Sequence, residues 1–237
     1  YPLPYELYEK HKIRRYGFHG TSHRYVAGKC AEMCGKPIED LKIVTCHLGN
    51  GSSISAVKGG KAVDTSMGFT PQGGVEMGTR SGDIDPTIVP YLVKTLGYTI
   101  DDAEDLINKR SGFLGVSGQS SDSRNICDLS EAGDYRATLA LKILYHEVKR
   151  YIGAYTAVMN GIDAIVFTAG IGENDRVLRY NVCKDMEFFG IKFDNEVNMS
   201  IPRGEAGELS TKDSRVKVFV IPTDEEYMIA QDTAALV

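Results

Sequence analysis

The sequence predicts an α/β protein in which three antiparallel strands precede alternating helices and strands. Residues 41–67 contain three short β-rich apolar runs joined by two glycine-rich turns, a pattern typical of a meander. Apolar residues then recur at helical spacing, most strongly over 134–160. Two further apolar runs, 164–168 and 215–221, read as buried strands, and a helical pattern follows each. These three observations set the fold class.

Each element also has a local signal. A helix is predicted over about 22–33, because Gly35 and Pro37 end it. Residues 68–86 have almost no aliphatic content and predict a long loop, which is uncommon unless it is functional. Helical periods resume over 87–96 and 101–108. The last helix begins after residue 224, where acidic side chains suit a helix N-terminus.

This element order is that of the ribonuclease-H-like fold, which actin-like (ASKHA) ATPases and sugar-kinase-like phosphotransferases share. We therefore expect a β-β-β-α-β-α-β-α core, with a helical insertion over approximately residues 87–160. The chain has 237 residues, of which 42% are hydrophobic, enough for one large domain or a domain and a half. Tyr1 stands where a Met is expected, which suggests a fragment of a longer protein.

Composition narrows the class of partner. The 27 basic and 32 acidic residues give a net charge of −5, which argues against a general nucleic-acid or membrane-surface binder. No apolar run approaches the roughly 20 residues that span a bilayer. The five cysteines are irregularly spaced and form no zinc-binding set, so we expect reduced thiols in a cytoplasmic protein. Small anionic substrates remain possible, since a few cations suffice for them.

Two glycine-rich segments follow predicted strands. The first is His47-Leu48-Gly49-Asn50-Gly51, which can turn tightly and leave backbone N–H groups pointing at an anion. It is no Walker loop, because neither Gly-Lys-Ser/Thr nor a helix follows it. The second is Gly170-Ile171-Gly172-Glu173-Asn174, ahead of a helix from about Asp175. Together they favour a nucleotide phosphate site, although the second segment alone could be a tight structural turn.

Several polar side chains are candidates for chemistry. Arg80 lies among glycines in the long loop and would pair with a carboxylate or with an anion, such as a transferring phosphoryl group. His19 precedes a helix and could donate to a phosphoryl oxygen. His47 could orient phosphate or simply pack. A zinc site of His19, His23 and His47 is disfavoured, because no fourth ligand accompanies them.

Two acidic segments have both a functional and a structural interpretation. Asp122, Ser123 and Arg124 could bind a ribose and stack on a base, or could form a capped turn before a helix. Glu225 and Glu226 could hold Mg²⁺, which often takes only one or two protein carboxylates, or could cap the last helix.

Four motifs in order resemble the acetate kinase family, which comprises acetate, propionate and butyrate kinases. They are YGFHGTSH at 16–23, HLGNGS at 47–52, GTRSGDIDP at 78–86 and TAGIGEN at 168–174. The resemblance covers nearly the whole chain. It implies an actin-like fold and phosphoryl transfer between ATP and a short carboxylate with Mg²⁺, giving ADP and acetyl phosphate when acetate is the acceptor. It also implies a cytoplasmic homodimer.

The resemblance assigns roles by motif. His19 and Arg80 resemble the residues that stabilise the transition state, and Glu225 resembles the Mg²⁺ ligand, with Glu226 as a neighbouring alternative. The other matched positions resemble ATP-contacting residues: His47, Leu48, Gly49, Asn50 and Gly51 at the phosphates, Asp122, Ser123 and Arg124 at adenosine, and Gly170, Ile171, Gly172, Glu173 and Asn174 as a further segment.

The chain departs from the family at its beginning. Family members open with a strand and an Asn-Ser-Gly-Ser-Ser-Ser-type phosphate turn, in a half that also supplies a carboxylate-binding Arg and a catalytic Asp. We expect residues 1–237 to be the C-terminal nucleotide-binding domain, with the N-terminal domain missing. Acetate kinase activity is therefore expected of the parent protein and inactivity of the fragment. Propionate or butyrate kinase, or an inert nucleotide-binding or dimerisation module, are the alternatives.

Overall fold

The structure is a computed structural model that describes residues 1–236. The chain forms two compact units, which are described separately. The first unit contains Tyr1–Phe18, Asn50–Ser52 and Ser66–Glu147. The second unit contains His19–Gly49, Ser53–Thr65 and the chain from Val148 onward.

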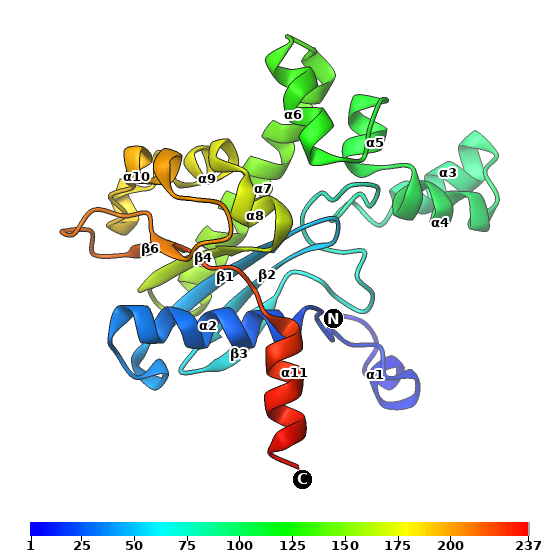
Figure 1. Ribbon diagram of the computed structural model, residues 1–237. Helices are drawn as coiled ribbons and strands as arrows, with labels where there is room; N and C mark the ends of the chain where they lie inside the picture. The colour runs from blue at the N-terminus through cyan, green and yellow to red at the C-terminus, as the bar shows by residue number, and fades with distance from the viewer. Residues whose placement is uncertain (237) are drawn as a thin grey trace. The chain divides into compact units, whose positions relative to one another are not determined.

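The second unit is built on a six-stranded sheet with the strand order β3-β2-β1-β4-β6-β5 (Figure 1). The three consecutive strands at one end form the predicted meander, and β2 pairs with β3 in antiparallel register. The later strands β4 and β6 are added parallel to β1. The bounds are β1 Lys42–Leu48, β2 Ser52–Lys58, β3 Lys61–Thr65, β4 Ala164–Thr168, β5 Gly207–Glu208 and β6 Lys217–Val220.

The central strands are buried on both faces, and this explains their composition. Strand β4 is Ala-Ile-Val-Phe-Thr, and every residue in it is buried. Parallel strands covered on both sides read as continuous apolar runs rather than as alternating ones. One face of the sheet packs against α2 (Gly20–Cys34) through a cluster that includes Val26, Cys30 and Val166.

Helices of the second unit lie on both sides of the sheet in Figure 1, with α2 on one side and α8 to α10 on the other. Helix α8 follows β4 directly, and α11 follows β6 after a short connection. The bounds are α8 Ala169–Asn174, α9 Arg176–Cys183, α10 Asn195–Ser200, α11 Glu225–Ala234, and the 3-10 turns η1 Ile38–Asp40 and η2 Glu187–Phe189.

The first unit consists of helices with short connections and of the long loop 66–87. A capping box begins α4, since Thr99 and Asp102 exchange side-chain to backbone hydrogen bonds. The 24-residue helix α7 starts in this unit and continues into the second. The bounds are α1 Tyr5–His11, α3 Ile88–Leu96, α4 Ile100–Lys109, α5 Gly112–Ser117, α6 Ser123–Glu131 and α7 Tyr135–Val158.

The expected strands, the main helices and the loop at 68–86 are therefore confirmed, and the strand order matches the predicted class. One prediction about local structure is wrong. Residues 170–174 were expected to form a turn ahead of a helix, but they are themselves helical, within α8. The chain enters this helix through Ala169, whose φ of 64° changes the backbone direction in a single residue.

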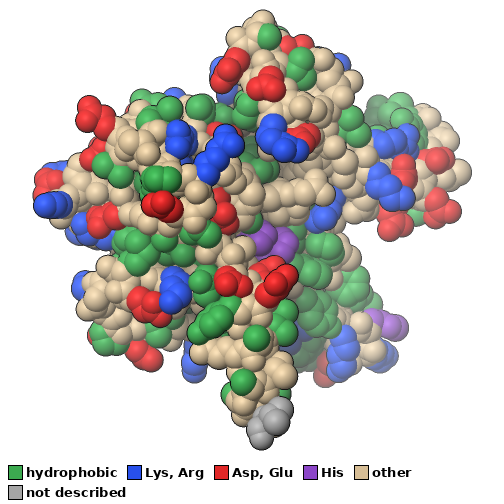
Figure 2. Space-filling model, in the orientation of Figure 1, with side chains coloured by type: hydrophobic (Ala, Val, Ile, Leu, Met, Phe, Trp, Pro, Cys, Tyr) green, Lys and Arg blue, Asp and Glu red, His purple; other side chains and the backbone are tan. Residues whose placement is uncertain are grey.

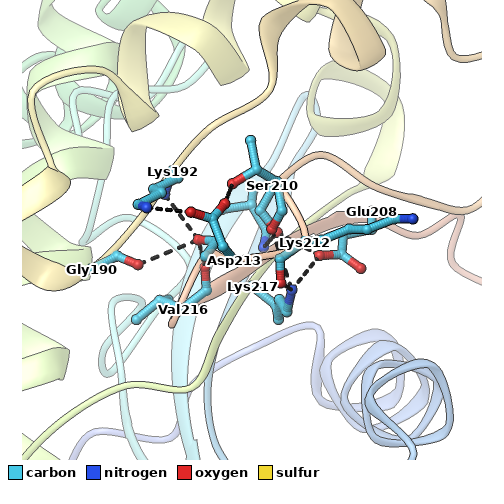
Figure 3. A network of polar contacts seen from close by, with 11 residues as sticks. Gly190, Lys192, Glu208, Ser210, Lys212, Asp213, Val216 and Lys217 are labelled. Carbon is cyan, nitrogen blue, oxygen red and sulfur yellow. Dashed lines mark hydrogen bonds and ion pairs between the residues drawn. The ribbon is translucent and has the colours of Figure 1, made fainter.

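A polar network surrounds the turn that leads into β6, near its pairing with β5 (Figure 3). Ser214 accepts from the Lys192 backbone N–H at 2.9 Å and donates to the Val216 carbonyl at 2.6 Å. Lys192 pairs with Asp213, and Lys217 pairs with Glu208 at 2.8 Å. These bonds fix the turn that leads into β6 and so set where β6 begins.

Charge is mixed on the face drawn in Figure 2, where Lys and Arg side chains alternate with Asp and Glu. This fits the net charge of −5. Among residues 1–236, no helix combines the length and the apolarity needed to cross a bilayer. Within the same residues none of the five cysteines forms a disulfide, and Cys30, Cys46 and Cys183 are buried.

Candidate functional site

The second unit gathers several predicted segments at one edge of its sheet. Strands β1, β4 and β6 run parallel, and His47 at the end of β1 lies opposite Thr168 at the end of β4. Parallel strands present their carboxyl ends at a common edge, where α/β proteins bind ligands. The segments that leave this edge are 47–49, 169–174 and 221–225.

Three histidines cluster in this unit. The rings of His19 and His47 stack, with centroids 4.0 Å apart and an angle of 13° between their planes. The His23 ring stands edge-on to both, at 6.5 Å from His19 and 6.1 Å from His47. The sequence pointed to His19 and His47 separately, and the structure brings them into contact.

Hydroxyl groups bind the Nδ1 atom of each of these rings. Ser53 Oγ lies 2.9 Å from His19 Nδ1 and 2.7 Å from His23 Nε2. His23 Nδ1 lies 2.7 Å from Thr45 Oγ1, and His47 Nδ1 lies 2.8 Å from Ser22 Oγ. Burial, together with the neighbouring imidazoles, lowers the pKa of His23 to about 3 and that of His47 to about 4. Both rings are neutral at pH 7 and act as hydrogen-bonding groups.

His19 holds a backbone conformation that is rare for its residue type. Its φ is 60° and its ψ is 27°, in the left-handed region, at the N-cap position of α2. Such a conformation costs a non-glycine residue on the order of 1–3 kcal/mol and tends to occur at functional sites. In this conformation the His19 ring reaches Ser53 and His47.

A chain of polar contacts continues from His47 to the segment after β6. Ser22 Oγ lies 2.8 Å from Thr223 Oγ1. The Thr223 backbone N–H donates to Glu173 Oε1 at 3.3 Å, and Thr168 Oγ1 lies 3.5 Å from the same oxygen. Glu173 of α8 and the segment before Glu225 are therefore joined directly.

Glu225 is the first residue of α11 and is half-buried, whereas Glu226 is exposed. The preceding Asp224 caps the helix, since its carboxylate accepts from the Tyr227 N–H at 2.8 Å. Because Asp224 does the capping, the Glu225 carboxylate is not needed for that purpose. A single carboxylate oxygen donor at this edge fits Mg²⁺, which takes most of its ligands from water and phosphate.

The zinc interpretation is not supported by the geometry. Among residues 1–236, no group of three or more His, Cys, Asp or Glu side chains is arranged to hold a metal ion. The Nδ1 atoms of His19, His23 and His47 already meet hydroxyl oxygens.

Arg80 belongs to the first unit and lies in a loop with many internal hydrogen bonds. Its Nη1 donates to the Pro71 carbonyl at 2.8 Å and lies 3.3 Å from Met77 Sδ. Within residues 1–236, no carboxylate lies within ion-pair distance of its half-buried guanidinium. Of the two partners that the sequence allowed, the anion is therefore favoured over the salt bridge.

The loop is too closely packed for Arg80 to move far. Asp83 ties it internally, accepting from the Gly74 N–H at 2.8 Å and donating its own N–H to the Gly74 carbonyl at 2.8 Å. The turn 77–80 also binds the start of α5, where the Phe113 N–H donates to the Met77 carbonyl at 2.9 Å. A Cβ at Gly112 would collide with that carbonyl oxygen, so only glycine fits there.

Three predicted segments of the first unit meet at Gly78. A Cβ built on Gly78 would lie 2.6 Å from Asn50 Oδ1 and 2.9 Å from the Ser121 carbonyl oxygen. The tip of the first glycine-rich turn, the arginine loop and the segment before Asp122 are thus in contact. The sequence alone gave no indication of this contact.

Asp122 caps α6, as the structural interpretation of this segment predicted. Its Oδ1 accepts from the Arg124 N–H at 2.9 Å, and its Oδ2 from Arg124 Nη2 at 2.6 Å. The hydrogen bonds from Arg124 lower the pKa of Asp122 to about 2. Arg124 itself is exposed. A role at adenosine remains compatible with this cap, since the guanidinium stands in solvent.

Glu76, which the sequence did not single out, is a buried acid beside the arginine turn. It is 2% exposed, and neither carboxyl oxygen has a hydrogen-bond partner within residues 1–236. Its backbone N–H donates to Glu147 Oε2 at 2.6 Å. Burial and the nearby Glu147 charge raise the pKa of Glu76 to about 8. The carboxyl is therefore protonated at neutral pH.

We expect Glu76→Gln to stabilise the protein at pH 8 by on the order of 3 kcal/mol. The folded carboxyl holds its proton up to about pH 8, whereas the unfolded one loses it near 4.5. The contribution of Glu76 to stability is therefore complete below pH 4.5 and is lost as the pH rises to 8. Urea unfolding from pH 5 to 9 should show that the free energy of unfolding falls less in Glu76→Gln than in the unmodified protein. The exposed Glu104→Gln is the control, and equal pH slopes in both variants would contradict the prediction.

Sequence reasoning missed the residues that support the predicted site. The hydroxyls of Ser22 and Ser53 contact His47 and His19, and that of Thr223 contacts Ser22, but single serines and threonines carry no pattern. Arg179 gave a weak signal, as a charged residue on the apolar face of a helical segment. It is fully buried.

Comparison with known proteins gives a consistent result. The sequence model of the acetokinase family matches residues 1–231. Curated acetate kinases from Clostridium novyi and Acetivibrio thermocellus are 59% and 58% identical to the chain over all 237 residues. The acetate kinase structure from Porphyromonas gingivalis superposes with a TM-score of 0.96 at 51% identity, over 99% of this chain and 59% of that one.

A propionate kinase structure from Francisella tularensis superposes with a TM-score of 0.90 at 42% identity, over 98% of this chain and 58% of that one. These likenesses support the actin-like α/β fold. The chain spans 59% of the length of the two curated relatives.

Proposed function

The chain belongs to the acetokinase family, and from this premise we propose that the protein interconverts ATP plus acetate with ADP plus acetyl phosphate. The observation that carries the proposal is Arg80, a half-buried cation held in a tied loop with no carboxylate partner among residues 1–236. A guanidinium in this situation is suited to the equatorial oxygens of a transferring phosphoryl group.

In the reaction we propose, a carboxylate oxygen attacks the γ-phosphorus in line with the departing ADP oxygen. Arg80 would neutralise the charge that builds up on the phosphoryl oxygens, and His19 would donate a hydrogen bond to one of them. The stacked His47 and the Ser53 hydroxyl orient the His19 ring. Because His23 and His47 stay neutral, neither adds a fixed charge.

Nucleotide contacts are proposed for three sets of residues. The phosphates would meet His47, Leu48, Gly49, Asn50 and Gly51. The adenosine would meet Asp122, Ser123 and Arg124, and a further contact would come from α8, which contains Gly170, Ile171, Gly172, Glu173 and Asn174. Glu225 would hold Mg²⁺, which screens the phosphate charge when it is bound.

The rest of the assignment concerns the whole protein. We propose that residues 1–237 form its C-terminal nucleotide-binding domain, with the helical segment at about 87–160 as an insertion, and that it acts as a homodimer. A cytoplasmic location is supported by ATP as the phosphoryl donor and by five cysteines that form no disulfide within residues 1–236. We propose acetate and not propionate as the substrate, because the curated relatives named above are acetate kinases.

Two measurements test the function. Isothermal titration of the 237-residue chain with Mg-ADP should show one site per chain, and an absence of binding would remove the nucleotide assignment. The complete natural protein should form acyl phosphate, trapped as a hydroxamate, from ATP and acetate. A higher kcat/KM for propionate or butyrate would instead assign it to those substrates. Nucleotide binding without turnover in the complete protein would support the inert-module alternative.

A further inference from the structure

Helix α8 is too short to satisfy its own backbone groups. An α-helix leaves its last four carbonyls without partners inside the helix, and α8 has only six residues. One of these four, the Ile171 carbonyl, is satisfied locally, and the Gly170 carbonyl just before them gains a side-chain partner. The Asp175 N–H donates to the Ile171 carbonyl at 2.8 Å, and Asn174 Nδ2 donates to the Gly170 carbonyl at 2.8 Å.

Two more of the four carbonyls, those of Gly172 and Glu173, are bound by one buried side chain. Arg179 Nη1 donates to the Gly172 carbonyl at 2.9 Å and to the Glu173 carbonyl at 2.7 Å. Arg179 is 0% exposed. Burial lowers its pKa to about 10, so it still carries its charge at pH 7. A positive charge at the C-terminal end of a helix also opposes the negative end of the helix dipole.

A second residue fixes the guanidinium itself. Asn198 is buried on α10, and its Oδ1 accepts from Arg179 Nε at 2.8 Å. Asn198 Nδ2 then donates to the Arg176 carbonyl at 3.0 Å. Arg179 is therefore bound on both sides, by α10 and by α8. Its Nη2 has no hydrogen-bond partner among residues 1–236, so the buried charge is satisfied only through Nη1 and Nε.

The consequence of this arrangement reaches the sheet edge. The backbone that Arg179 holds belongs to Glu173, whose side chain accepts from the Thr223 N–H. Thr223 contacts Ser22, which in turn contacts His47. The same guanidinium thus supports α8 and, through Glu173, the connection into α11.

We infer that Arg179 is a positioning residue for nucleotide binding, which holds α8 in the conformation that meets the nucleotide. The inference rests on the proposed function, since it assigns α8 a nucleotide contact. Arg179 itself stays behind the helix and touches no substrate. The charge and the forked geometry are both required, because one nitrogen serves two carbonyls while another binds Asn198.

The first test is Arg179→Lys, which keeps the charge but lacks the fork. We expect the Kd for Mg-ADP and the KM for ATP to rise about tenfold, with the KM for acetate unchanged. Arg179→Met, which also removes the charge, should weaken nucleotide binding further. The control is Arg176→Lys on the same helix, whose Nη2 contacts the Ile201 carbonyl instead of α8. It should bind Mg-ADP as the unmodified protein does.

Hydrogen exchange provides a second test, which depends neither on nucleotide binding nor on whether Arg179→Met folds stably. Amide hydrogen exchange without nucleotide should be faster over 169–175 in Arg179→Lys than in Arg176→Lys, with exchange elsewhere in the sheet unchanged. Unaltered exchange and unaltered Kd in Arg179→Lys would overturn the inference. An equal rise of the KM values for ATP and acetate would also overturn it, because that is the result of general destabilisation. If the unmodified protein bound no Mg-ADP, the proposed function would fail, while the exchange measurement would still decide whether Arg179 holds α8.

Discussion

Replacing Arg80 with alanine is expected to lower kcat about 10³-fold and to leave the affinity for ATP nearly unchanged. The reason is that the guanidinium has no carboxylate partner among residues 1–236 and is held by Pro71 and Met77 in a loop that cannot relax. Its charge is therefore available for the transition state and adds little to ground-state binding. The measurement is steady-state kinetics of the complete protein, with Mg-ADP titration of the same variant.

Two further variants make this test more specific. Arg80→Lys keeps the charge but presents a compact ammonium instead of a planar fork, so part of the kcat should return. Arg110→Ala removes another loop arginine, which forms a surface ion pair with Asp105, and should leave kcat as it is. An Arg80→Ala protein with unchanged kcat would show that the assigned role is wrong. A proportional loss of ATP affinity would instead make Arg80 a ground-state ligand.

His19→Ala is expected to lower kcat about 10²-fold. The ring is held by Ser53 and by stacking on His47, and the backbone strain at His19 is retained in spite of its cost. His19→Asn separates conformation from chemistry, because asparagine tolerates the left-handed region better than other residues with a side chain. It should keep the thermal stability of the unmodified protein and, by its amide donor, recover part of the activity lost in His19→Ala.

The matched control is His11→Ala, since His11 is exposed on α1 and takes no part in the cluster. Equal kcat values for the His11 and His19 variants would contradict a role for His19 in charge stabilisation. The pH profile gives a further check. His23 and His47 have pKa values of about 3 and 4, so neither should contribute an inflection between pH 5 and 8.

Most of the fold could be predicted because its signals are local. The strands of the meander are separated by glycine turns, and β4 is a short apolar run between turn residues. Helix α1 was missed because it buries no side chain, and so it leaves no apolar stripe in the sequence. Residues 170–174 were mistaken for a turn because two glycines disfavour a helix. The bonds from Arg179 that offset this preference come from a residue outside the segment.

The sequence predicted which segments form the candidate site, but it did not predict which side chains touch one another there. Motifs pointed to His19, His47 and Arg80, but the stacking of the two imidazole rings depends on how the start of α2 and the end of β1 pack together. Glu76 carried no pattern at all, because its unusual pKa arises from burial against Glu147. Long-range burial of this kind is a property of the packed chain.

The candidate site lies at the carboxyl ends of the parallel strands β1, β4 and β6. Their amino ends, on the opposite side of the sheet, are therefore available for spectroscopic labels. The turn before β6 has exposed residues, Lys212 among them, and the network around Ser214 and Lys192 holds it in place. A fluorophore on a cysteine introduced at Lys212 would lie at the amino end of β6, with the length of that strand between it and the segment 221–225. Such a reporter could follow ligand arrival through energy transfer without occupying the surface where the ligand binds.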